Sequence, residues 1–196
     1  SSDSEYAVLE FVWKVNKGKW TDKMYKAVEG GNSSPKLFVT GPFGGGLGAF
    51  VNLQKIRAMV FVCAGVGVTP VASMMDMFSS DTRKFVHVVW SFRSMGLFEY
   101  LHHHFDKLPD ENCNFHFTSK DQPTEFAAKI KAGRPKLPDI LADVRGKCKE
   151  RGLLDIGVFV CGPNPMVVDV LRTTSTLNQE KGQDTYFHVH SESFQM

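Results

Sequence analysis

The sequence predicts an α/β fold in which helices cover both faces of a doubly wound sheet of five parallel strands. Two observations carry this prediction. From residue 58 onward, short apolar runs alternate with stretches of helical pattern, which is the order of successive βαβ units. Glycine-containing turns follow two of these runs directly. Because crossovers between parallel strands are right-handed, this order builds an open sheet.

The expected strands are short apolar runs rich in β-branched and aromatic residues. They cover residues 58–63, 84–90, 114–118, 157–161 and 185–190. The helices expected between them cover residues 70–78, 97–105, 137–150 and 165–177. This alternation predicts one full domain in the second part of the chain.

The first 48 residues follow a different pattern. An apolar, β-branched run over residues 6–15 is typical of a strand, residues 20–28 of a short helix and residues 37–40 of a short strand. Two stretches rich in glycine, 30–35 and 41–48, read as loops. These elements are too few to close a core of their own, so they are expected to be a fragment of another domain.

Composition narrows the classes of function. Of the 196 residues, 42% are hydrophobic and 22% are charged, and the formal net charge is +2 with no dense basic block, so nucleic acid is not an expected partner. Four widely spaced cysteines without a CxxC pair predict neither a zinc site nor a disulfide scaffold and fit a reducing compartment. No apolar run approaches the roughly 20 residues that span a bilayer. The chain is therefore expected to be a soluble piece excised from a longer protein, since it begins at Ser1 without a methionine.

The sharpest local signal is the segment Cys63-Ala64-Gly65-Val66-Gly67-Val68-Thr69-Pro70, which leaves an expected buried strand and enters a helix. Glycines let the backbone approach a pyrophosphate, and a helix amino terminus offers free N–H groups. Thr69 suits the N-cap and Pro70 the first helical position. The pattern has only two of the three glycines of GxGxxG, so an ordinary tight turn between strand and helix is the alternative reading.

A second glycine turn, Cys161-Gly162-Pro163, follows the strand expected at residues 157–161. In an open α/β sheet, ligands bind at the carboxyl ends of the strands near the point where the strand order reverses. Cys161 and Gly162 are therefore expected to line the same crevice as Gly65 and Thr69. The alternative for Cys161 is a small buried hydrophobic residue, the commoner fate of a free cysteine.

Arg93 closes the segment Trp90-Ser91-Phe92-Arg93 at the end of the second expected strand, where doubly wound sheets bind the adenosine ribose. An acidic residue there would accept hydrogen bonds from a 2′-hydroxyl, whereas an arginine accommodates a 2′-phosphate. The residue therefore favours NADP over NAD, and a solvated surface arginine is the alternative. His102, His103 and His104 lie in an expected helix, where neighbours point about 100° apart and cannot converge on one metal. No metal site is predicted.

Taken together, these motifs resemble the carboxyl-terminal dehydrogenase region of the NADPH oxidase and ferric reductase family, within the ferredoxin-NADP reductase superfamily. The resemblance covers nearly the whole chain. Its motifs, in order, are Gly18-Lys19-Trp20-Thr21, Gly41-Pro42-Phe43-Gly44, Ala64 to Pro70, Gly133-Arg134-Pro135, Cys161-Gly162-Pro163 and the terminal aromatic Phe194.

The resemblance implies that residues 1–44 are the carboxyl-terminal remnant of a flavin-binding β-barrel, and that residues 45–196 form the NADPH-binding domain. Thr21 and Phe43 then belong to the FAD site. By the same resemblance, the NADPH pyrophosphate would be held by Gly65, Val66, Gly67, Thr69 and Pro70. Arg93 would take the 2′-phosphate, and Arg134 would be a nearby nucleotide contact.

Near the reacting ring, the resemblance implies that Cys161, Gly162 and Pro163 border the nicotinamide and that Phe194 covers the flavin. The implied activity is hydride transfer from NADPH to FAD, followed by single-electron steps to haem in an upstream membrane domain of the same protein. This places the chain on the cytosolic side of a membrane. Gln195 and Met196 extend past the terminal aromatic, which looks more like ferric-chelate reductases, so the final acceptor, oxygen or ferric chelate, stays open.

Two alternatives remain at this stage. The same fold could serve as a nucleotide-sensing or protein-interaction module without catalysis, because fold alone does not fix function. The chain could also belong to a soluble cytochrome reductase, which would lack membrane helices upstream.

Overall fold

The computed structural model describes residues 10–30, 38, 50, 55–75, 78, 85–120, 126, 128–182 and 184–192. The chain divides into two compact units, residues 1–43 and residues 44–196.

The described part of the first unit is built around helix α1 (Trp20–Glu29). Its start is held by side chains: the Asn16 N–H donates to Thr21 Oγ1 at 2.9 Å, and the Gly18 N–H donates to Asp22 Oδ2 at 3.0 Å. The strand expected over residues 6–15 is not formed over its described part, residues 10–15. A strand needs a hydrogen-bonding neighbour, and the described residues of this unit do not provide one.

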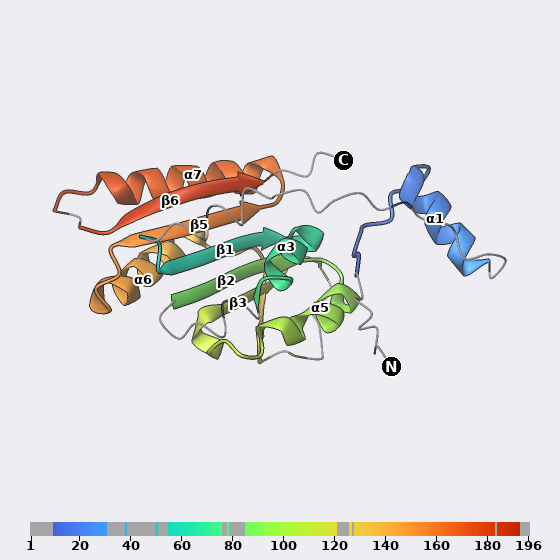
Figure 1. The fold of residues 1–196 in the computed structure, drawn as a ribbon, viewed down its shortest axis with the longest axis horizontal. Helices are drawn as coiled ribbons and strands as arrows, with labels where there is room; N and C mark the ends of the chain where they lie inside the picture. The colour runs from blue at the N-terminus through green and yellow to red at the C-terminus, as the bar shows by residue number, and fades with distance from the viewer. Residues whose placement is uncertain are drawn as a thin grey trace, which may run out of the picture. The chain divides into compact units, whose positions relative to one another are not determined.

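The second unit is a sheet of six parallel strands in the order β4-β3-β2-β1-β5-β6, which confirms the α/β fold with a parallel sheet (Figure 1). The strands are β1 (Ala58–Ala64), β2 (Phe85–Phe92), β3 (Cys113–Phe117), β4 (Ile130–Ala132), β5 (Asp155–Cys161) and β6 (Tyr186–Glu192). The expected number of five was wrong, because the edge strand β4 was missed. It has only three residues, of which Ile130 alone is buried, too little to leave an alternating or apolar pattern.

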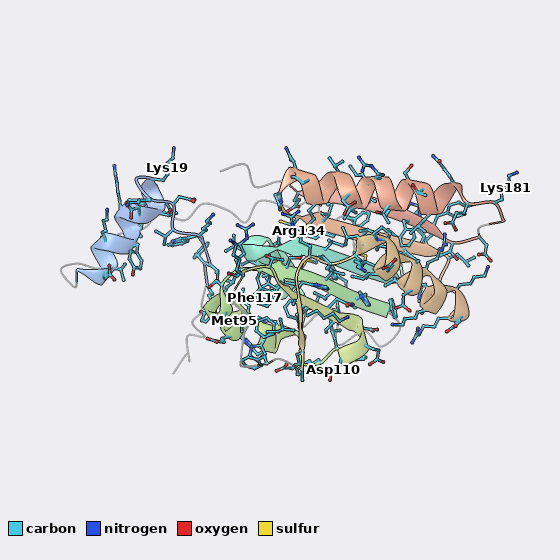
Figure 2. The ribbon with its side chains drawn as sticks, turned by 180° about the vertical axis from the view of Figure 1, so that it is seen from behind. Lys19, Met95, Asp110, Phe117, Arg134 and Lys181 are labelled. Atoms are coloured by element: carbon cyan, nitrogen blue, oxygen red, sulfur yellow. The ribbon has the colours of Figure 1, made fainter. Side chains whose placement is uncertain are left out.

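Helices cover both faces of the sheet, as expected for a doubly wound fold. The helical segments of this unit are η1 (Gly65–Val68), α3 (Thr69–Ala72), α5 (Met95–Leu101), η2 (His102–Phe105), η3 (Asp110–Asn112), α6 (Leu137–Glu150) and α7 (Asn164–Gln179). The helices α6 and α7 lie on the face turned to the viewer in Figure 2, whereas α3 and α5 lie on the face seen in Figure 1. Among the described residues, no helix has the length and apolar character needed to cross a membrane.

The central strand β1 shows why the sheet forms. Its side chains alternate between two cores: Val60 and Val62 pack with α6 and α7, whereas Phe61 faces Phe78 and Phe159 at ring-centroid distances of 5.2 and 6.2 Å. Being buried on both faces, the strand reads as one continuous apolar run. Burial of each such side chain stabilises the fold by about 1.5 to 3 kcal/mol.

The register aligns the carboxyl ends of the strands at one edge. Cys63 near the end of β1 pairs with Trp90 of β2 on one side and with Cys161 of β5 on the other. Phe92 at the end of β2 pairs with Phe117 at the end of β3. The loops that follow these strands therefore leave the sheet side by side.

Candidate nucleotide-binding site

The glycine turn after β1 is a single 3₁₀ turn, η1, that runs without interruption into α3. Gly65 opens it with φ of +53°, in the left-handed region that favours glycine. The prediction that Thr69 is the N-cap was wrong. Thr69 is the first α-helical residue and Pro70 the second, and Val68 before them already has helical dihedral angles. An N-cap residue needs an extended backbone, so Thr69 instead donates its hydroxyl to the Val66 carbonyl at 2.9 Å.

The two glycine turns are in direct contact. A Cβ atom added to Gly67 would lie 2.5 Å from the carbonyl oxygen of Cys161 and 2.9 Å from its Sγ. A Cβ added to Gly162 would lie 3.1 Å from the Cβ of Ala64. The two distances at Gly67 are shorter than side chains tolerate, and the distance at Gly162 is tighter than most Cβ contacts, so glycine at both positions suits the close approach of the two turns. The structure therefore places Gly65, Gly67, Cys161 and Gly162 in two adjoining turns at the carboxyl edge of the sheet.

Cys161 is fully buried beneath Gly67. Burial, and to a smaller extent the Glu192 carboxylate, raises the pKa of its thiol to about 11. Burial also raises the pKa of the neighbouring Cys63 thiol. Both thiols are therefore protonated at neutral pH, and neither can act as a nucleophile or a general base. Cys161 contributes its shape, and its position beside a nicotinamide stays a prediction.

Two arginines follow strands at the same edge of the sheet. Arg93 comes directly after β2, and Arg134 comes two residues after β4, whose Ala132 pairs with Phe117 of β3. Figure 2 labels Phe117 and Arg134 at this edge. Both arginines are exposed, and neither forms an ion pair or hydrogen bond with another residue that the structure describes. Two guanidinium groups at one edge, without a partner among the described residues, suit an anionic ligand.

The turn before Arg134 is held by backbone and side chain. Gly133 has φ of +80°, and its N–H donates to the Phe117 carbonyl at 2.9 Å. Its carbonyl lies 3.2 Å from Nδ1 of the buried His116. Because a carbonyl can only accept, Nδ1 carries the proton of the His116 ring.

Comparison with known proteins adds the family. Residues 61–172, which include both glycine turns and Arg93, match the family described as the oxidoreductase NAD-binding domain. The chain belongs to this family. Because that match runs from β1 into α7, it covers the core of the sheet and both glycine turns of this NAD-binding domain.

Similar proteins include NADPH oxidases. This NAD-binding domain is 26% identical to a superoxide-generating NADPH oxidase heavy chain of Dictyostelium discoideum, over 83% of this chain and 36% of that protein. It is 28% identical to mouse NADPH oxidase 4, over 82% of this chain and 30% of that protein. It is 27% identical to Drosophila melanogaster dual oxidase, over 90% of this chain and 14% of that protein. The chain thus spans about a third or less of these relatives.

A solved structure with a similar chain is phthalate dioxygenase reductase. The two chains are 18% identical, the match covers 71% of this chain and 36% of the reductase chain, and the TM-score is 0.47.

The remaining residues predicted for the site are placed as follows. Val66 is half-buried within the 3₁₀ turn, and Pro163 is exposed directly before α7. Thr21 belongs to the first unit, where its hydroxyl accepts the Asn16 N–H. Phe43 and Phe194 lie outside the described residues, so their predicted roles at the flavin stay predictions.

Sequence reasoning missed Trp90. This residue lies in β2, two positions before its end, and its indole N–H donates to the Gly65 carbonyl at 3.0 Å. An apolar strand residue 25 positions from the turn gives no signal of such a bond.

The three consecutive histidines lie in the 3₁₀ segment η2. The ring of His102 stacks on Phe98 with centroids 5.2 Å apart, and His103 is exposed. Across the described part of the chain, no group of three His, Cys, Asp or Glu side chains could hold a metal ion.

Proposed function

We propose that this NAD-binding domain binds NADPH across the carboxyl edge of its sheet and delivers the nicotinamide hydride to FAD. The contact between Gly67 and Cys161 carries this proposal. In this contact the turn after β1, which suits a pyrophosphate, meets the turn after β5. One extended dinucleotide can therefore touch both turns. Both glycines are needed for the turns to meet, because a Cβ at Gly67 would meet Cys161 and a Cβ at Gly162 would meet Met166 and Ala64.

Selectivity for NADPH rests on the two arginines. Arg93 and Arg134 follow β2 and β4, on the side of β1 away from β5, where the adenosine half of the nucleotide would lie. A guanidinium group binds phosphate through paired, charge-assisted hydrogen bonds. The 2′-phosphate distinguishes NADPH from NADH and supplies such a partner.

The protein's part in the reaction is positioning. When bound, the nicotinamide donates a hydride and the flavin accepts it, so the cofactors supply the electronic chemistry. The glycine turns bring the dinucleotide close to the backbone, and Arg93 fixes its far end. The protonated thiol of Cys161 takes no part in proton transfer and packs beneath Gly67, where it supports the turn after β1.

Titration of the chain with NADPH and NADH by isothermal calorimetry tests this proposal. We expect NADPH to bind at least tenfold more tightly than NADH, since a charge-assisted hydrogen bond contributes about 1.5 to 3 kcal/mol. Binding of neither nucleotide at millimolar concentration would overturn the proposal and favour an interaction module on the same fold.

We further propose that the chain is the cytosolic part of a longer protein whose membrane domain carries haem, and that residues 1–43 complete its FAD site. The support is the similarity to NADPH oxidases that are several times longer. The full-length protein in membrane vesicles, supplied with NADPH and FAD, should reduce either oxygen to superoxide or a ferric chelate. If the protein reduces neither oxygen nor the ferric chelate, this part of the proposal is overturned.

A further inference from the structure

The indole of Trp90 connects the core of the sheet to the glycine turn. Trp90 is fully buried, and its N–H donates to the carbonyl of Gly65 at 3.0 Å. An indole has one donor and no acceptor, and a buried N–H without a partner is costly. The bond therefore ties the position of the Gly65 carbonyl to the position of the ring.

The ring itself has little freedom. Aromatic side chains from four different elements surround it at centroid distances between 5.0 and 6.1 Å: Phe92 of β2, Phe98 of α5, Phe105 of η2 and Phe115 of β3. Close packing of this kind fixes one rotamer, because moving the ring would displace several neighbours.

The fixed carbonyl determines where the next N–H points. In a trans peptide, the C=O of Gly65 and the N–H of Val66 lie in one plane and point in opposite directions. With the carbonyl directed to the buried indole, the Val66 N–H is directed away from the aromatic core. The left-handed Gly65, with φ of +53°, is what allows the chain to turn at this peptide.

We propose that Trp90 is a positioning residue, whose N–H holds the peptide between Gly65 and Val66 so that the Val66 N–H donates to the pyrophosphate of the dinucleotide. This inference rests on the proposed function. It assigns separate roles to two nearby residues: Trp90 of β2 sets the pyrophosphate site, and Arg93, directly after this strand, sets the choice between NADPH and NADH.

The test replaces one atom group. Trp13 and Trp20 are changed to Phe in the first unit, and Trp90 is then replaced by 3-benzothienylalanine, in which sulfur stands in place of the indole N–H. The matched control is the same Trp13→Phe, Trp20→Phe chain with Trp90 intact. Trp90→Phe serves as a second variant that also lacks the N–H. Urea unfolding establishes that each variant is folded.

We expect the dissociation constants for NADPH and NADH to rise by the same factor, about three- to tenfold, because both nucleotides share the pyrophosphate and a hydrogen bond contributes about 0.5 to 1.5 kcal/mol. Adenosine 2′-phosphate has no pyrophosphate, so its affinity, followed by NMR titration, should not change. In the chain without nucleotide, hydrogen exchange at the Val66 amide should become faster.

Three results would overturn the inference while leaving the proposed function standing. They are unchanged affinity for both dinucleotides in the folded sulfur variant, an equal loss for adenosine 2′-phosphate, and a loss confined to NADPH. If the control chain binds neither dinucleotide, the proposed function and this inference fail together.

Discussion

At the scale of single residues, Gly67 is a position where an added side chain would meet backbone. In Gly67→Ala the new Cβ would meet the backbone carbonyl of Cys161 at 2.5 Å, and backbone cannot rotate away as a side chain can. We expect the free energy of unfolding to fall by about 1 to 3 kcal/mol, the range for overpacking, and NADPH binding to weaken at least tenfold. Urea unfolding and calorimetry measure the two effects.

The matched control is Gly146→Ala in α6, where an added Cβ meets nothing within 4 Å. Relieving the entropic cost of a helical glycine should raise the free energy of unfolding by roughly 0.5 to 1 kcal/mol. Equal changes in the two variants would show that the turns after β1 and β5 are not in the contact described.

The role proposed for Arg93 is tested by Arg93→Ala. Loss of charge-assisted hydrogen bonds to a 2′-phosphate should weaken NADPH binding by about 1 to 3 kcal/mol and leave NADH binding nearly unchanged. Arg172→Ala removes another exposed arginine, on α7, and should affect neither nucleotide. An equal loss of both nucleotides in Arg93→Ala would contradict the assignment.

The need for glycine in the turn after β1 was predicted correctly from the sequence, and binding of a nucleotide there stays a prediction. Gly65 and Gly67 were identified because a strand that turns directly into a helix needs backbone without Cβ. Thr69 was misplaced because the sequence does not reveal that a 3₁₀ turn precedes the helix. Trp90 was missed because its bond to Gly65 depends on how β1 and β2 pair.

At the scale of elements, the same logic explains which strands were predictable. Strands buried on both faces, such as β1 and β2, carry uninterrupted apolar runs. The edge strand β4 joins the sheet through the backbone of β3, and backbone pairing leaves no trace in the sequence. Helix α6 occupies the range expected for it, residues 137–150, because its buried positions repeat with helical spacing.

A buried polar network links β2, β3 and β4. Lys131 donates to Asn114 Oδ1 at 2.6 Å, so the amide N–H₂ of Asn114 faces Nε2 of His87 at 2.8 Å. Nε2 must therefore accept, which requires a neutral His87 ring. Burial, and then the charge of Lys147, lowers the pKa of His87 to about 4; Asp143 opposes this effect, and Lys131 adds to it.

This network predicts a pH dependence of stability. In the unfolded state His87 binds a proton near pH 6.5, whereas in the folded state it does so only near pH 4. The contribution of the neutral His87 ring to the free energy of unfolding is therefore fully present above pH 6.5 and is lost as the pH falls from 6.5 to 4. The loss at pH 4 should reach up to about 3 kcal/mol. Urea unfolding of the protein and of His87→Val, measured from pH 7.5 to 4.5, should show a shallower decline for the variant.

The control is His103→Gln, which removes an exposed histidine of η2. Its decline with pH should match that of the parent chain. His116 is also buried, and burial lowers its pKa, so some decline remains in His87→Val. A variant whose decline equals that of the parent chain would show that the His87 ring is not the group that titrates.

At the scale of the whole molecule, the sequence predicted two parts that bind different cofactors. Every residue that we propose for NADPH lies between Gly65 and Pro163, within the second compact unit. Thr21 lies in the first unit, with α1. The final electron acceptor was not predictable, because the residues proposed for the site bear only on NADPH and FAD.

This division predicts that residues 44–196 fold and bind NADPH without the first unit. The six-stranded sheet and both cores belong to this unit, so it should unfold in one cooperative transition. Its dissociation constant for NADPH should lie within about twofold of the value for the whole chain. Urea unfolding and calorimetry on the two proteins measure this directly. A truncated protein without a cooperative transition would contradict independent folding of residues 44–196. A truncated protein that folds but loses NADPH would place part of the nucleotide site in residues 1–43.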